Sequence, residues 1–318
     1  MSLSRRTLLQ RASAAAMAVL AGRLPARSQP RPALVRKPIP SSGEQIPVIG
    51  LGSSQTFNLA PGNPDYATGQ QVLKLFRDLG GKVIDSAPTY QRSEIFIGES
   101  IQQLGIKDDL FISTKVNVVQ AGKAAARAQM EESSRVYGRR TIDLMQVWNL
   151  GDSIRNLTDL FLAEHLEAVT EWKAAGRTRY IGITTSRDPQ YADVEAAMNR
   201  YKLDFVQLDY SIGDRIPEQR LLPLAREKGI AVLVNRPFGS SSLFSRVRGR
   251  ALPAWASEID CTAWSQFFLK YIVSHPAVTC AIPATGDPAH LRENMEACRG
   301  RMPDAAFRRR METYFDAQ

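Results

Sequence analysis

The stretch that decides the fold of this chain is Gly81-Lys82-Val83-Ile84-Asp85-Ser86-Ala87-Pro88-Thr89-Tyr90. Its short apolar run ends on the carboxylate of Asp85, and the hydroxyl of Tyr90 follows five positions later. This order is typical of a buried strand that presents polar groups at its carboxyl end, where the active sites of parallel α/β folds lie. A simpler interpretation is that Asp85 caps the next helix and Tyr90 packs beside it.

Strand and helix patterns alternate on both sides of this stretch. The expected strands are continuous apolar runs, as in a sheet that helices cover on both faces. We predict strands at residues 46–52, 83–84, 110–114, 142–147, 180–183, 205–208, 230–234 and 278–282, and helices at 69–79, 93–104, 121–137, 160–175, 189–201, 218–228, 262–274, 288–297 and 305–315.

About eight strand–helix units in a chain of 318 residues favour a closed α/β fold, the (β/α)8 TIM barrel. A doubly wound open sheet is the alternative. That fold usually has a glycine-rich phosphate turn after its first strand, and Gly50-Leu51-Gly52-Ser53 lacks the third glycine of that turn.

The first 26 residues resemble a twin-arginine export signal, with Ser4-Arg5-Arg6-Thr7-Leu8-Leu9-Gln10 followed by a mild apolar stretch and small residues up to Ala26. The apolar stretch is too short for a permanent membrane helix. We therefore predict a signal peptide over residues 1–26, a Pro-rich linker over 27–37 and a single barrel domain over 38–318. These assignments imply the Tat export machinery as a partner, a periplasmic location and no stable membrane anchor. A disordered basic tail is the alternative.

The remaining composition indicates neither a metal protein nor a nucleic-acid-binding protein. The formal net charge is +9, and the first 26 residues contribute four arginines and no acid, so +5 remains without them. No basic stripe interleaved with aromatic residues is visible. The three cysteines and three histidines are widely spaced and suggest neither a disulfide framework nor a metal site.

Polar residues gather at the ends of successive predicted strands, and a barrel would bring them to one mouth. They are Asp85 with Tyr90, Lys115, Trp148 with Asn149, Thr184 with Thr185, Gln207 with Tyr210, Asn235 with Arg236, and Thr285. A tyrosine hydroxyl can act as a general acid, an ammonium lowers its pKa, and a carboxylate can hold that ammonium. Tyr90, Lys115 and Asp85 supply these three groups, although Lys115 alone is equally typical of a solvated loop.

Several motifs carry a resemblance to a known family. Asp-x-Ala-x-x-Tyr occurs at residues 85–90, Ser-Glu-x-x-Ile-Gly-Glu at 93–99 and Thr-Lys at 114–115, and the segments at 176–183 and 282–294 agree as well. In their order and spacing these motifs resemble the aldo-keto reductase family over residues 44–298.

The resemblance implies a barrel reductase that passes hydride from NADPH to a small-molecule carbonyl compound without a metal. Tyr90 would donate the proton, Lys115 would lower the pKa of Tyr90, and Asp85 would hold the lysine. Gln207 would bind the nicotinamide carboxamide, Tyr210 would stack on the ring, and Arg236 would lie near the pyrophosphate. The cofactor-binding set implied in this way is Gly52, Thr184, Gln207, Tyr210, Arg236, Thr285, His290, Glu293 and Asn294.

Trp148 breaks the family pattern, because the family has its fourth catalytic residue, a histidine, five positions after the aspartate at 143. An indole N–H donates a hydrogen bond but cannot carry a proton. Three outcomes are open. Trp148 would polarise a carbonyl oxygen while Tyr90 gives the proton, or it would reshape the pocket for a substrate with an activated double bond. Alternatively, Trp148 would fill the pocket, so that the protein binds a ligand without catalysing a reaction. The two functions under consideration are therefore an oxidoreductase and a catalytically impaired protein that binds a dinucleotide or another ligand.

Two further departures concern the cofactor. Thr184-Thr185 replaces the Ser-Asn that often holds the carboxamide in the family, so the amide is lost at Thr185. Ala284 and His290 occupy the positions where some branches hold the 2′-phosphate with Lys and Arg. We expect NADP(H), with NAD(H) as the alternative.

Overall fold

The computed structural model describes residues 32–118, 121–148, 159–186 and 190–318. The predicted signal peptide and Asn149 lie outside these residues. Leu34–Gln318 form one compact unit. Its main sheet contains eight parallel strands in the order β10-β9-β8-β7-β6-β5-β4-β3. The strands are β3 (Leu51–Gly52), β4 (Val83–Asp85), β5 (Phe111–Val116), β6 (Ile142–Trp148), β7 (Thr178–Thr184), β8 (Phe205–Asp209), β9 (Ala231–Asn235) and β10 (Val278–Ala281).

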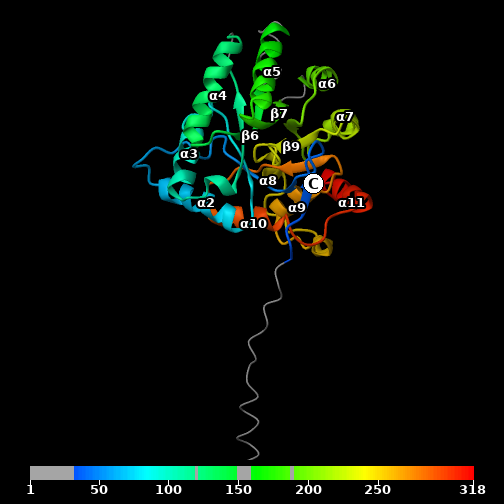
Figure 1. Ribbon diagram of the computed structural model, residues 1–318. Coiled ribbons are helices and arrows are strands. Elements are labelled where there is room, and N and C mark those ends of the chain that lie inside the picture. Colours follow the sequence, from blue (N-terminus) through cyan, green and yellow to red (C-terminus); the bar gives the residue numbers. More distant parts are fainter. Residues whose placement is uncertain (1–31, 119–120, 149–158, 187–189) are drawn as a thin grey trace, which may run out of the picture. The chain divides into compact units, whose positions relative to one another are not determined.

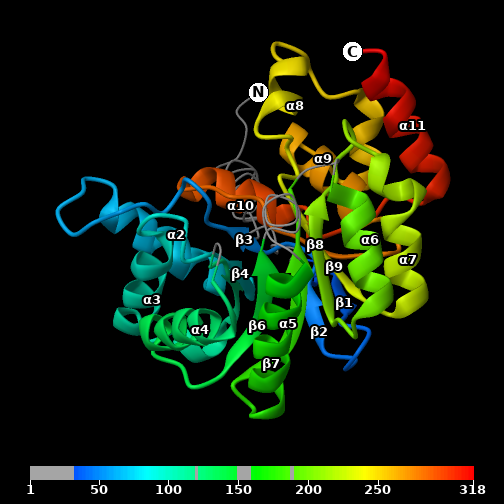
Figure 2. The same cartoon turned by 90° about the horizontal axis from the view of Figure 1, so that it is seen from above.

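Helices follow the strands and lie on the outer side of the sheet, as Figures 1 and 2 show. The α-helices are α2 (Tyr66–Asp78), α3 (Ser93–Gln103), α4 (Lys123–Tyr137), α5 (Asp159–Ala174), α6 (Tyr191–Arg200), α7 (Leu221–Lys228), α8 (Ser242–Arg246), α9 (Trp264–Val273), α10 (Pro288–Glu296) and α11 (Ala305–Asp316). Short 3-10 helices are η1 (Lys107–Asp109), η3 (Ile216–Gln219) and η4 (Ala254–Ile259). In the part of the chain that is described, no helix is long and apolar enough to cross a membrane.

The sheet closes where the first strand meets the last. The amide of Gly50 donates to the carbonyl of Ala281 at 2.8 Å, and the amide of Gly52 donates to Pro283 at 3.0 Å. Gly52 is needed for this approach, because a Cβ there would lie 2.7 Å from Ile282 O. Gly50 allows an equally close approach to β4, since its Cβ would lie 2.8 Å from Val83 O. The predicted (β/α)8 barrel is therefore confirmed.

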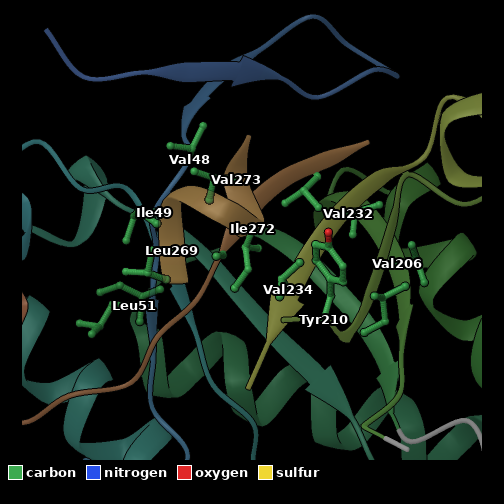
Figure 3. Packing of buried hydrophobic residues seen from close by; sticks show 14 of the residues in the cluster. Val48, Ile49, Leu51, Val206, Tyr210, Val232, Val234, Leu269, Ile272 and Val273 are labelled. Carbon is green, nitrogen blue, oxygen red and sulfur yellow. The ribbon is translucent and has the colours of Figure 1, made fainter. Parts of the chain in front are cut away.

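Buried apolar residues form two clusters, as strand alternation requires. One cluster contains at least one residue from every strand from β4 to β10, including Phe111, Tyr180 and Phe205, and fills the interior of the barrel. The other lies between the strands and the helices, where residues of α9 such as Leu269 and Ile272 pack near the strands (Figure 3). The interior cluster gives way to polar side chains toward the carboxyl ends of the strands, which is where the candidate site lies.

A hairpin precedes the barrel and was not predicted. β1 (Arg36–Pro38) pairs antiparallel with β2 (Gln45–Pro47), and Ile39 and Ile46 join the interior cluster. Lys37 Nζ donates to the carbonyls of His275 and Val278 at 2.7 Å each. The linker prediction is therefore wrong for residues 34–37, which belong to the barrel unit. The prediction of one strand over 46–52 is also wrong, because two strands share that segment.

The segment between the strand predicted at 230–234 and the helix predicted at 262–274, for which no element was predicted, contains α8 and η4. The helix predicted over 218–228 is divided into η3 and α7, with Arg220 between them in a non-helical conformation. Neither difference moves the strand ends that carry the candidate site.

Candidate functional site

A cavity of about 550 Å³ opens at the carboxyl ends of the strands. Six of the predicted site residues line it: Gly52, Asp85, Tyr90, Trp148, Gln207 and Arg236. Asn235, expected at the mouth of the barrel, lines it too, whereas sequence reasoning did not single out the lining residues Ser53, Ser54, Ser186, Phe238, Ser240 and Ser241. The serines and Phe238 come from loops, where no strand period indicates which side chains point inward.

A buried ion pair forms the floor of the cavity. Lys115 Nζ lies 2.6 Å from Asp85 Oδ2 and donates to the carbonyl of Ser86 at 2.7 Å. Burial by itself would lower the pKa of Lys115, but Asp85, Tyr90 and Glu94 together outweigh burial, and the pKa is raised. Ser113 Oγ donates to the other carboxylate oxygen at 2.7 Å. Asp85 thus holds the lysine, and the interpretation of Asp85 as a helix cap is wrong.

Tyr90 lies above this pair, with Lys115 Nζ 5.2 Å from the centroid of its ring. Burial raises the pKa of the Tyr90 hydroxyl, and Lys115 lowers it by less, so the pKa lies above its ordinary value. Lys115 thus acts in the expected direction, but burial outweighs it. At neutral pH the hydroxyl keeps its proton.

Trp148 is the last residue of β6, and its ring meets the ring of Tyr90 edge to face at 5.7 Å between centroids and 84° between planes. The indole therefore occupies one wall of the cavity beside the hydroxyl-bearing ring. His165 is buried on α5 and its Nε2 hydrogen-bonds the Ala121 carbonyl at 2.8 Å, so it does not replace the absent histidine. Within the described ranges, no group of three or more His, Cys, Asp or Glu side chains is placed to hold a metal.

Gln207 lies beside the floor and hydrogen-bonds a residue that was not predicted, Gln146. The two amides are 2.7 Å apart, and both reach Asp85. Alternation along β6 puts Gln146 on the same face as Trp148, two positions away, and this was the signal that could have identified it.

Tyr210 does not reach the cavity, and its predicted role on a nicotinamide ring is corrected here. It follows β8 one position after Asp209, so alternation turns it outward. Its ring packs against Tyr271 and His275, at 6.0 and 5.8 Å between centroids, and its hydroxyl donates to Glu218. Tyr210 joins the helices behind the sheet.

Arg236 lies at the rim of the cavity with a positive φ of 45°. Its Nη1 donates to Asp209 Oδ2 and to the carbonyl of Ser186, each at 2.9 Å, while half of the side chain is exposed. A second arginine on the same loop, Arg246, instead donates to the carbonyl of Asp316 in the C-terminal helix. Arg236 is thus the cation of this loop that the structure brings to the cavity lining.

The predicted adenosine-end residues lie on the segment from β10 to α10 and do not line the cavity. His290 is exposed and its Nδ1 lies 3.8 Å from Asp287 Oδ2, and Thr285 Oγ1 accepts from the amide of Asp287 at 3.1 Å. Glu293 is half-buried and Asn294 is buried. Thr184, another predicted cofactor residue, is buried at the end of β7 and also lies outside the lining.

Comparison with known proteins identifies the family. Residues 48–313 match the model of the Aldo/keto reductase family, which covers well over half of the chain. An aldo/keto reductase from Klebsiella pneumoniae, solved in complex with NADP and acetate, aligns with a TM-score of 0.69 and 24% identity, covering 86% of this chain and 93% of that one. The holo form of an aldo-keto reductase from Bacillus halodurans aligns with a TM-score of 0.70 and 21% identity, covering 89% and 96%.

Curated relatives are similarly distant. Aldo-keto reductase YhdN of Bacillus subtilis (strain 168) is 26% identical over 206 residues, covering 62% of this chain and 60% of its own length. The NADH-specific methylglyoxal reductase of Escherichia coli (strain K12) is 26% identical over 196 residues, covering 56% and 58%. The chain thus spans about three fifths of the length of these two relatives.

Proposed function

Because the chain belongs to the aldo/keto reductase family, we propose that it is an NADP(H)-dependent oxidoreductase that reduces a small carbonyl compound, with Tyr90 as the proton donor. An activated double bond is the second acceptor class. The observation that carries the proposal is the buried Asp85–Lys115 pair beneath a neutral tyrosine at the wall of a cavity.

The residues of the chain would work as follows. Bound NADP(H) would supply the hydride for the carbonyl carbon. The Tyr90 hydroxyl donates its proton to the carbonyl oxygen, so that the product is an alcohol. Lys115, held by Asp85, stabilises the phenolate that Tyr90 becomes, because an ammonium close to the ring favours the charged form. Trp148 would offer its indole N–H to the carbonyl oxygen in place of the family's histidine.

The side chains at the cavity fit a nicotinamide nucleotide. Gln207 presents an amide beside the floor, and the buried Oδ1 of Asn235 has no hydrogen-bond partner in the described part of the chain. Arg236 places a cation at the rim, where an anionic pyrophosphate would bind. Gln207 would hold the carboxamide, and Thr285, Glu293 and Asn294 would lie toward the adenosine end. Similar structures were solved in complex with NADP and with NADPH, which supports NADP(H), and the name of the NADH-specific relative keeps NAD(H) as the alternative.

The substrate would be small and polar. The cavity carries many serines and one arginine beside the aromatic pair of Tyr90 and Trp148. Two relatives are named methylglyoxal reductases, so a small dicarbonyl compound belongs in the first panel of substrates.

Purified protein tests the proposal with NADPH or NADH and a panel of aldehydes, ketones and enones. We expect cofactor oxidation that Tyr90→Phe abolishes and that the matched control Tyr201→Phe preserves, because Tyr201 ends α6 outside the cavity. Turnover that survives in Tyr90→Phe would remove Tyr90 from the mechanism.

One observation favours the second function, a catalytically impaired binding protein. The indole of Trp148 lies directly against the ring of Tyr90, where it takes up space that a substrate would need. Cofactor binding without turnover on any carbonyl compound or enone would favour this function, and carbonyl reduction gained in Trp148→His would assign the impairment to the indole.

We further propose that residues 1–26 are a twin-arginine signal and that the barrel works in the periplasm. Paired Arg5-Arg6 before a mild apolar stretch supports this proposal. In cell fractionation, the full chain would be found in the periplasm, and the double variant Arg5→Lys/Arg6→Lys would accumulate in the cytoplasm. Equal distribution of both chains would argue for an ordinary basic tail.

A further inference from the structure

We propose that Gln146 is a positioning residue, which fixes the amide of Gln207 relative to the Asp85–Lys115 pair and so determines how the nicotinamide carboxamide is held. The inference rests on the proposed function and assigns a role to a residue that does not itself line the cavity.

Gln146 lies in the polar layer beneath the cavity and is completely buried. Its Nε2 is 2.7 Å from Gln207 Oε1, 3.0 Å from Ser113 Oγ and 3.3 Å from Asp85 Oδ1. One amide nitrogen thus contacts the carboxylate of the ion pair and the amide that borders the cavity.

The acceptors around Gln146 fix the orientation of both amides. The ionised carboxylate of Asp85 can only accept, so Gln146 must turn its NH2 group toward it. Gln207 then meets that NH2 group with Oε1, and its own Nε2 lies 3.4 Å from Asp85 Oδ2. A flipped Gln207 would put two NH2 groups together and an oxygen against the carboxylate. Gln207 therefore offers one defined donor and one defined acceptor position to a carboxamide.

Gly182 makes this contact possible. Gln146 is on β6 and Gln207 is on β8, with β7 between them, so their backbones lie two strand spacings apart, roughly 9–10 Å. Gly182 is the β7 residue in register with Gln146. It lies two positions after the interior residue Tyr180, so it faces the interior of the barrel as well. A Cβ at Gly182 would lie 2.8 Å from the carbonyl of Phe205. The missing side chain leaves the space across which the two amides meet.

The fold alone gives little reason for an amide at this position. The Oε1 of Gln146 is buried and has no partner among the described residues. An unsatisfied buried acceptor costs about 1–3 kcal/mol, and an apolar side chain of similar length would avoid that cost. The amide of Gln146 therefore matters for the hydrogen bonds of its Nε2, and all of these are made to residues of the site.

The test uses Gln146→Met, which keeps the length of the side chain and removes the amide. Loss of one net hydrogen bond in the positioning of Gln207 predicts a dissociation constant for NADPH raised about three- to tenfold, measured by protein fluorescence. Hydride transfer from NADPH deuterated on one face should lose its preference for that face. The matched control Gln266→Met makes the same substitution at a buried glutamine on α9, which accepts from the amide of Thr262 and does not line the cavity, so both readouts should remain as in the wild type.

The double variant Gln146→Met/Gln207→Met decides whether Gln146 acts through Gln207. We expect it to bind NADPH no more weakly than Gln207→Met alone, whereas additive losses would overturn the inference. Wild-type affinity and facial preference in a folded Gln146→Met would overturn it as well. If Gln146→Met does not fold, Gln146→Leu also removes the amide with a smaller apolar side chain, with the same expected losses. A wild-type protein that binds neither NADPH nor NADH would refute the proposed function instead.

Discussion

Removing one member of the Asp85–Lys115 pair should unfold this protein far more readily than removing an exposed pair. Both side chains are almost completely buried, at 3% and 0% exposure, and their atoms lie 2.6 Å apart. Lys115→Met leaves the Asp85 carboxylate with neutral donors only, and Asp85→Asn leaves a buried ammonium. A buried charge without its partner costs about 3–5 kcal/mol, and we expect each single variant to lose that amount of unfolding free energy.

Urea unfolding at neutral pH, followed by circular dichroism, measures these losses. The double variant Asp85→Asn/Lys115→Met removes both charges, so it should lose clearly less than the two single losses added together. The control is the exposed pair Lys74–Asp78, whose side chains are 59% and 36% exposed, where Lys74→Met should leave the unfolding midpoint close to that of the wild type. Single losses below about 1 kcal/mol, or strictly additive losses, would refute the reasoning that burial makes this pair interdependent.

Three further predictions concern pH and the pocket. Because burial raises the pKa of Tyr90, kcat/KM for carbonyl reduction should stay constant up to the ordinary tyrosine value near 10 and fall only above it, and a fall below about pH 9 would contradict this. Burial, aided by Arg308, lowers the pKa of His275 to about 4. Neutral His275 therefore contributes to the free energy of unfolding above about pH 6.5, and this contribution is lost as the pH falls toward 4. Since the ring is part-exposed, His275→Gln should reduce this acid loss in urea titrations by only about 1 kcal/mol, and an unchanged loss would show that other groups cause it. Trp148→His should increase carbonyl turnover about 10²-fold or more by restoring a group that can carry a proton, and unchanged turnover would place the limitation elsewhere.

The barrel could be predicted because its strands are continuous apolar runs, each followed by a helical pattern. The run from Val83 to Asp85 is buried throughout, and the chain order of strands equals their order in the sheet. The hairpin of β1 and β2 could not be predicted in the same way. Its strands are only three residues each and contain Pro38 and Pro47. Such short, proline-containing segments have no strand pattern in the sequence, and their pairing is visible only in the structure.

The candidate site could be predicted where residue type and strand period agree. Asp85 and Lys115 end neighbouring strands and face inward, and the structure joins them. Tyr210 was placed wrongly because its residue type suggested stacking while its position, one past an inward-facing residue, turns it outward. Gln146 was missed although strand alternation places it on the face of Trp148, because its hydrogen bond to Gln207 across β7 is visible only in the structure.

The direction in which the pKa of Tyr90 is shifted also could not be predicted from the sequence. The sequence supplies the ammonium that lowers the pKa, but the burial that raises it depends on how the cavity walls pack around the ring. The Trp148 side chain that lies against Tyr90 is part of that wall.

The most direct test of the central claim is the rate at which wild-type protein and Tyr90→Phe oxidise NADPH in the presence of a small carbonyl compound. The account predicts turnover by the wild type, loss of that turnover in Tyr90→Phe, and unchanged NADPH binding in both. Equal turnover by the two proteins, or a wild type that binds no nicotinamide nucleotide, would contradict it.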